Sequence, residues 1–180
     1  MTGWRVYPAL LALVAFLVAG CGGPPGPELA PPAQPRTFDL GWVERDKTDM
    51  FTFRVDWLRV GDDGWSAKVS AANGSDTPYR IQEGSVGLVL LDTATMAEVR
   101  RLTGDLEHTP PTMKPDRLRP PPPSVLGPGA VWTGTISGSE VLRQGSVVRV
   151  LFGPYSSAGE RFRSEATEFF WVTDHWVRLR

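Results

Sequence analysis

The residue with the most distinctive chemistry is Cys21, the only cysteine among 180 residues. It follows an apolar run, residues 9–18, and the small residues Ala19 and Gly20, while Arg5 places a positive charge before the run. The run has about 10 residues, fewer than the ~20 that a membrane-spanning helix needs, and is typical of a secretory signal peptide. A single thiol in an exported chain cannot form an internal disulfide, so we expect another use for it.

The stretch Leu17-Val18-Ala19-Gly20-Cys21 resembles the lipobox of bacterial lipoprotein precursors. The resemblance implies cleavage between Gly20 and Cys21, which removes a signal peptide of residues 1–20. It also implies diacylglycerol on the Cys21 sulfur and an N-acyl chain such as palmitate on the new amino terminus. Each buried CH₂ contributes about 0.8 kcal/mol, so these chains would hold the protein at a membrane. We therefore expect an extracytoplasmic protein, lipid-anchored to the bacterial membrane, with no other cofactor.

The rest of the sequence offers little for catalysis or metal binding. It has no nucleophile elbow, no His-Glu-x-x-His motif and no phosphate-binding glycine loop. Asp174, His175 and Ser156 are of the types that form a catalytic triad, but their spacing in the sequence does not indicate one. Asp174 and His175 supply only two metal ligands, and the aspartates at 62–63 fit a hairpin turn better than a calcium loop. We predict no catalytic residues and no metal site; a hydrolase that uses His108 or His175 is an alternative.

The balance of charge bears on the partners. The chain has 19 Lys and Arg against 20 Asp and Glu, and residues 1–20 contain Arg5 and no acid, so the mature chain has 18 against 20, a formal charge of −2. A nearly neutral chain without a basic stripe gives no support for nucleic-acid binding. Besides the membrane, we expect an envelope protein or a wall polymer as the partner.

Composition divides the chain after the signal peptide into a spacer and a domain. Residues 21–36 contain six prolines and few large apolar side chains, which predicts an extended linker. At about 3.1 Å per residue it would lift the domain roughly 45 Å from the lipid surface. Residues 37–180 are long enough for one domain with its own core.

The domain has the alternation of β-strands. Apolar residues alternate with polar ones over 38–42, 51–57 and 65–71, and the phase slips after Trp57, which predicts a β-bulge there. The turn Gly61-Asp62-Asp63-Gly64 predicts a hairpin. Further strands are expected at 79–81, 86–91, 131–137, 146–152 and 166–173, with residues 175–180 extending the last. About seven to nine short strands favour an all-β antiparallel sandwich, with a closed β-barrel as the alternative.

Two stretches carry a family resemblance. Residues 66–79, SAKVSAANGSDTPY, are similar to a strand that ends in an Asn-x-Ser-Asp turn in immunoglobulin-like domains of bacterial surface lipoproteins. Residues 126–134, LGPGAVWTG, resemble the hairpin of these domains in which an aromatic strand follows Pro-Gly. The resemblance implies an immunoglobulin-like fold, as in the immunoprotective extracellular antigens of mycobacteria. It transfers no catalytic or binding residue to this chain.

Aromatic and proline-rich positions are the candidates for partner contact. Trp57, Trp65, Trp132 and Trp171 are in phase with other apolar residues, so we expect them in the core. Trp176 is the best candidate for an exposed aromatic side chain, although edge packing is the simpler expectation.

Residues 104–124 are rich in proline, which predicts an irregular loop without strands. We expect a surface crossover whose removal preserves folding; the alternative is a preformed partner site. Its candidate contact residues are Arg117, Arg119, Pro121 and Pro122.

Together these features predict a membrane-anchored, non-catalytic binding or accessory module at the cell envelope. A carrier of a small apolar or metal ligand is an alternative. A deep cavity lined by Trp and Phe would favour the carrier, and a packed core would argue against it.

Overall fold

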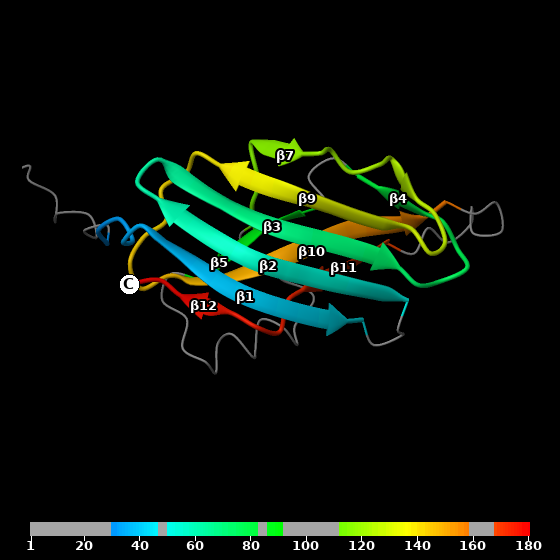
Figure 1. Ribbon diagram of the computed structural model, residues 1–180, viewed down its shortest axis with the longest axis horizontal. Coiled ribbons are helices and arrows are strands. Elements are labelled where there is room, and N and C mark those ends of the chain that lie inside the picture. The colour runs from blue at the N-terminus through cyan, green and yellow to red at the C-terminus, as the bar shows by residue number, and fades with distance from the viewer. Residues whose placement is uncertain (1–29, 47–49, 83–85, 92–111, 159–167) are drawn as a thin grey trace, which may run out of the picture.

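The protein is a sandwich of two antiparallel β-sheets (Figure 1). The structure, a computed structural model, describes residues 30–46, 50–82, 86–91, 112–158 and 168–180. Neither sheet closes on itself, so the predicted sandwich is confirmed over the barrel. None of the residues described belongs to a helix that is long and apolar enough to cross a membrane. Residues 1–29, which include the expected signal peptide and Cys21, and His108 lie outside the described residues.

One sheet has five strands in the order β1-β2-β3-β9-β7. Their bounds are β1 Arg36–Arg45, β2 Phe51–Gly61, β3 Gly64–Asn73, β9 Val131–Gly138 and β7 Arg117–Arg119. Neighbouring strands pair antiparallel throughout, and β1, β2 and β3 follow one another directly in the sequence. Arg36, the last residue of the expected linker, is therefore the first residue of an edge strand.

The other sheet has seven strands centred on β10, Val147–Ser157. Its members are β4 Tyr79–Ile81, β5 Val86–Leu91, β6 Thr112–Met113, β8 Val125–Leu126, β11 Glu168–Val172 and β12 Val177–Arg178. Phe152 of β10 pairs with β5 on one side and β11 on the other, and Tyr155 pairs likewise with β4 and β11. β4 and β5 thus follow one another along one side of β10. The described residues form twelve strands, five in the first sheet and seven in this one, more than the seven to nine expected, because several strands are only two or three residues long.

The β2–β3 hairpin and its bulge form as predicted. Gly61 pairs with Gly64, whose φ is +135°, and a Cβ at Gly64 would lie 2.1 Å from the Gly138 carbonyl oxygen, so only glycine fits there. The register shifts between Val55 and Trp57. A β-bulge places two consecutive residues of one strand opposite a single residue of its partner. Trp57 therefore pairs with Lys68 and points to the outer face of the sheet. The expectation that Trp57 lies in the core was wrong.

Aromatic rings fill the space between the sheets. The Phe53 ring of β2 lies 4.7 Å from the Phe152 ring of β10 and 6.3 Å from the Trp171 ring of β11, measured between centroids. The Phe51 ring stacks on Tyr155 at 5.2 Å. All of these except Trp171 are almost fully buried. Trp65 and Trp132 are also buried, as predicted, and Trp171 packs half-buried against the core.

Asn73 joins residues 66–79 to residues 126–134. Its side-chain amide donates hydrogen bonds to the carbonyl oxygens of Thr77, Leu126 and Gly127, and the Gly129 amide donates to its backbone oxygen. Only 1% of Asn73 is exposed. The buried Asn73 amide therefore links the turn after β3 to the turn before β9. Loss of these hydrogen bonds would leave buried polar groups unsatisfied and would destabilise the fold.

The end of the expected linker contacts the domain. Ala33 is buried and donates its amide to the Leu142 oxygen at 2.8 Å. Gln34 donates to the Arg180 oxygen, and Gln144 donates to the Pro31 oxygen. The chain therefore enters the sandwich through a short docked segment beside the C-terminal residues.

The proline-rich stretch takes part in both sheets, contrary to the strand-free crossover that was expected. β6 pairs with β5, and β7 pairs with β9 across the other sheet. The Pro120 oxygen accepts a hydrogen bond from the Trp132 indole at 3.2 Å, and the Asp116 carboxylate accepts two from Ser139. The prolines themselves stay outside the pairings, which is why short strands fit between them. Residues 104–111 lie outside the described residues.

Replacing residues 112–123 with a Gly-Ser sequence of equal length is expected to destabilise the protein. The free energy of unfolding should fall by about 3 kcal/mol or more, because β7 is lost and Leu118 no longer packs on the core. Urea denaturation measures the change. Pro123→Ser, at an exposed position, is the control and should cost less than about 1 kcal/mol. An unchanged unfolding transition in the Gly-Ser variant would instead support the expectation that the stretch is a simple surface crossover.

Candidate functional site

A wide bulge interrupts the strand pair formed by β10 with β11 and β12. Leu151 pairs with Val172 and Val148 pairs with Val177, so the two β10 residues between them face the four residues 173–176. The extra residues cannot continue the ladder and leave their amide groups free to point elsewhere. Two successive amides, those of Asp174 and His175, point at the opposite sheet.

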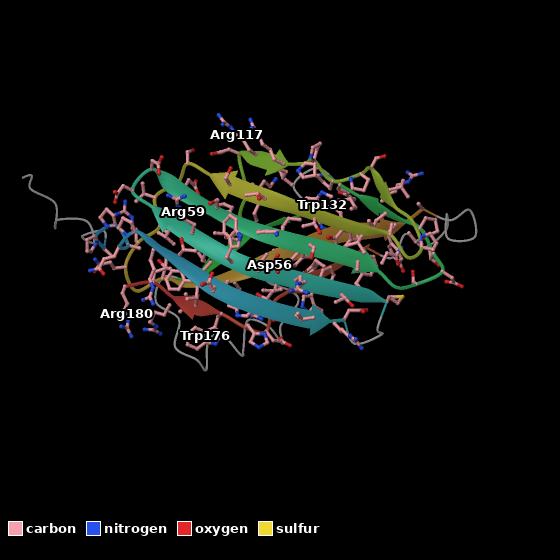
Figure 2. The ribbon with its side chains drawn as sticks, in the orientation of Figure 1. Asp56, Arg59, Arg117, Trp132, Trp176 and Arg180 are labelled. Atoms are coloured by element: carbon pink, nitrogen blue, oxygen red, sulfur yellow. The ribbon has the colours of Figure 1, made fainter. Side chains whose placement is uncertain are left out.

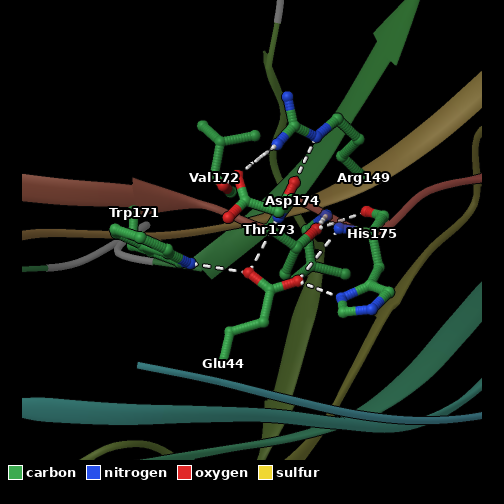
Figure 3. A network of polar contacts seen from close by, with 8 residues as sticks. Glu44, Arg149, Trp171, Val172, Thr173, Asp174 and His175 are labelled. Carbon is green, nitrogen blue, oxygen red and sulfur yellow. Dashed lines mark hydrogen bonds and ion pairs between the residues drawn. The ribbon is translucent and has the colours of Figure 1, made fainter. Parts of the chain in front are cut away.

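The group that meets these amides is the carboxylate of Glu44, on edge strand β1 (Figure 3). One carboxylate oxygen accepts from the Asp174 amide and from the Trp171 indole, both at 2.8 Å. The other accepts from the His175 amide at 3.0 Å and lies 2.7 Å from the His175 ring Nδ1. We call these contacts the Glu44 clamp. They tie the edge of one sheet to the bulge of the other.

The Glu44 clamp is built for an ionised carboxylate. Burial by itself raises the pKa of Glu44, since only 6% of the side chain is exposed. The hydrogen bonds from His175, Trp171 and Asp174 outweigh that cost, so the pKa of Glu44 lies below its usual value. Four donors to one carboxylate satisfy it as fully as backbone amides satisfy an anion in a nest.

Arg149 supports the bulge from the β10 side. Its buried guanidinium donates to the Thr173 oxygen and, at 3.2 Å, to the Val172 oxygen. It also lies 3.7 Å from the exposed carboxylate of Asp174. Burial lowers the pKa of Arg149, and the charges of Asp174 and Glu44 oppose this effect. The Thr173 hydroxyl completes the bulge by accepting from the Val150 amide and donating to the His175 oxygen.

The His175 side chain takes part in the Glu44 clamp although 59% of it is exposed. Its ring stacks on Trp42, with centroids 5.8 Å apart. Because an ionised carboxylate only accepts, Nδ1 is assigned as the donor of the contact with Glu44.

The triad considered from the sequence does not assemble. Glu44, and not Asp174, faces the His175 ring, and Asp174 lies beside Arg149. Ser156 pairs with Arg80 and Glu168 in the ladder, and no described hydrogen bond joins it to His175. Within the described ranges no three His, Cys, Asp or Glu side chains gather as metal ligands. The arrangement therefore has a structural role: the Glu44 carboxylate joins the two sheets through hydrogen bonds.

The residues expected to contact a partner are spread over the molecule. Arg117 and Arg119 are exposed on edge strand β7, followed by the exposed Pro121 and half-buried Pro122. Trp176 packs half-buried on the outer side of the other sheet, against Val89, Val147 and Leu151. Figure 2 shows Arg117 and Trp176 at opposite margins of the sandwich. They do not form one surface.

Glu44 and Arg149 were not predicted as functional residues, although each breaks the apolar pattern of its strand. Glu44 continues the inward phase of Phe38, Leu40 and Trp42, where an apolar residue is expected. Arg149 interrupts the apolar run of β10. A charge at a core position predicts a buried partner, because an unpaired buried charge is very unfavourable. What the sequence could not supply is the partner itself, which for Glu44 lies about 130 residues away.

Comparison with known proteins adds no relative: no protein-family model matches the chain, and no match was found among curated proteins or solved structures.

Glu44→Gln is expected to lower the free energy of unfolding by about 2 kcal/mol at neutral pH, because charge-assisted hydrogen bonds become neutral ones and one acceptor oxygen is lost. Urea denaturation measures the loss. Glu140→Gln, at an exposed carboxylate, is the matched control and should change stability by less than about 0.5 kcal/mol.

The pH dependence of the stability difference between the native protein and Glu44→Gln tests the pKa of Glu44. Because that pKa is lower in the folded protein than its usual 4.5, protonation in acid favours unfolding. The advantage of the native protein over Glu44→Gln should be complete above about pH 5 and shrink as the pH falls through the folded pKa. A constant advantage across this range would contradict a clamp that depends on the ionised carboxylate.

Proposed function

We propose that this protein is a lipid-anchored, extracytoplasmic binding module of the bacterial cell envelope that has no catalytic role. The observation that carries the proposal is the lipobox-like stretch Leu17–Cys21 behind an apolar signal-like run. The order of the segments supports it, because a proline-rich spacer separates Cys21 from the sandwich. Such a spacer keeps a tethered domain clear of the lipid surface.

The way the chain enters the domain agrees with a tether. The docked residues 30–35 lie at the end of the sandwich where Arg180 also lies (Figure 1). A tether attached at one end leaves the long faces of both sheets exposed to the surroundings. A module of this kind would meet its partner through a sheet face or edge.

The packing favours surface binding over a carrier. A carrier of an apolar ligand needs an interior space, and the stacked rings of Phe53, Phe152 and Tyr155 occupy the space between the sheets. The His175 ring lies 2.7 Å from the Glu44 carboxylate and stacks on Trp42, contacts that favour a structural role for this histidine.

The anchor is tested with Cys21→Ser in cells fed labelled palmitate. The native protein should carry the label and fractionate with membranes. Cys21→Ser should lose the label, because serine has no thiol to form the thioether, and should be released or should accumulate with its signal peptide attached. Mass spectrometry distinguishes these two results.

Gly23→Ser is the matched control, since it changes a neighbouring residue and keeps the thiol. It should be labelled and fractionated as the native protein. Cys21→Ser with the native mass and the native membrane fraction would refute the anchor. Labelling of Cys21→Ser at the native level would do so as well.

A further inference from the structure

The outer face of the five-stranded sheet bears a row of four polar side chains that neither the core nor the Glu44 clamp uses. Arg59 of β2, Ser66 of β3, Ser137 of β9 and Arg117 of β7 are paired in register, so they lie side by side across the sheet. All four line an open hollow of about 630 Å³. With strands about 4.8 Å apart, the backbones of the two arginines are about 14 Å apart, and two hydroxyls lie between them.

Neither arginine of this row forms an ion pair among the described residues, although Asp116 lies within electrostatic reach of Arg117. Both arginines are exposed. Asp63 and Asp116 line the end of the hollow, but Asp116 is held by the Ser139 amide at 2.6 Å and hydroxyl at 2.7 Å. A guanidinium fork without a partner matches a carboxylate or a phosphate.

The next row of the same face adds an aromatic ring. The bulge in β2 points Trp57 outward beside Lys68, and Thr135 and Arg119 follow across the sheet. Asp56 lies 3.5 Å from Lys68 and 3.0 Å from Arg54, so these two cations are already matched by an acid. Figure 2 shows Asp56 and Arg59 on this face. Half-buried Trp57 thus offers a flat apolar surface beside Arg59, two residues further along β2.

We propose that this face binds a glycan polymer that carries carboxylate or phosphate groups. Arg59 and Arg117 hold an anionic group over the hollow, Ser66 and Ser137 bond sugar hydroxyls, and Trp57 packs against a sugar ring. The proposal rests on the proposed function, because it names the partner of that envelope module.

A glycan fits this face better than a lipid surface does. Binding to anionic lipid relies on dense clusters of about four to eight Lys or Arg. Here hydroxyls separate the arginines, as a ligand with alternating hydroxyl and anionic groups requires. The face is also hollowed, whereas a bilayer surface would favour a protruding one.

The test uses the full-length protein extracted in an uncharged detergent. It is titrated with polygalacturonate, with dextran phosphate and with neutral dextran, and calorimetry gives the affinity. Phenylglyoxal then labels arginines, and mass spectrometry follows each one. Polygalacturonate or dextran phosphate should slow labelling of Arg59 and Arg117, while Arg80, exposed on the other sheet, serves as the control within the same molecule.

Variants assign the effect to the hollow. Arg59→Gln and Arg117→Gln are each expected to weaken binding about three- to tenfold, as the loss of one charge-assisted contact does at a solvated surface. Arg80→Gln removes the same charge from the other sheet and should change affinity by less than about twofold. Neutral dextran should bind at least about tenfold more weakly than the anionic glycans.

Several results would overturn the proposal. These are equal weakening by Arg80→Gln, equal binding of neutral dextran, and no binding of either anionic glycan. Protection of Arg59 and Arg117 by micelles doped with phosphatidylglycerol, without protection by the glycans, would assign the face to lipid instead. None of these bears on the anchor, because detergent removes the membrane and Cys21→Ser tests the anchor separately.

Discussion

The rest of the structure depends on the stacked aromatic rings between the two sheets. Phe51 and Phe53 of β2 meet Tyr155 and Phe152 of β10, with centroids 5.2 Å and 4.7 Å apart. A chain with one cysteine has no internal disulfide, so burial of apolar surface has to supply most of the favourable free energy of folding. Rings of this size set the spacing of the sheets and fill it. The interior therefore serves stability, which leaves the edges and outer faces of the two sheets for contact with a partner.

Two bulges turn this simple sandwich into one with distinctive surfaces. The bulge at Asp56 points Trp57 outward beside Lys68, on the face that also presents Arg59 and Arg117. The wider bulge after β11 turns two amides toward Glu44, which fastens the edge strand β1 to the other sheet. One bulge thus shapes a surface, and the other ties an edge strand to the opposite sheet.

Periodicity predicted the strands because inward and outward residues alternate cleanly on both sides of the Gly61–Gly64 hairpin. It also located the bulge near Trp57, but the direction of that ring depends on which residue is extra, and phase alone does not decide this. The strands between prolines 110–123 were missed because two- and three-residue strands have no period. The Glu44 clamp was missed because its partners come from the far end of the chain.

We propose that one chain combines a lipid anchor, a spacer and a packed sandwich whose outer face bears arginines and hydroxyls. The central claim is the anchor, since the anchor decides where the sandwich works. The most direct measurement is the mass of the N-terminal peptide of the protein purified from membranes. The account predicts a peptide that begins at Cys21 and carries diacylglycerol and an N-acyl chain. A peptide that begins elsewhere, or an unmodified Cys21, would contradict it.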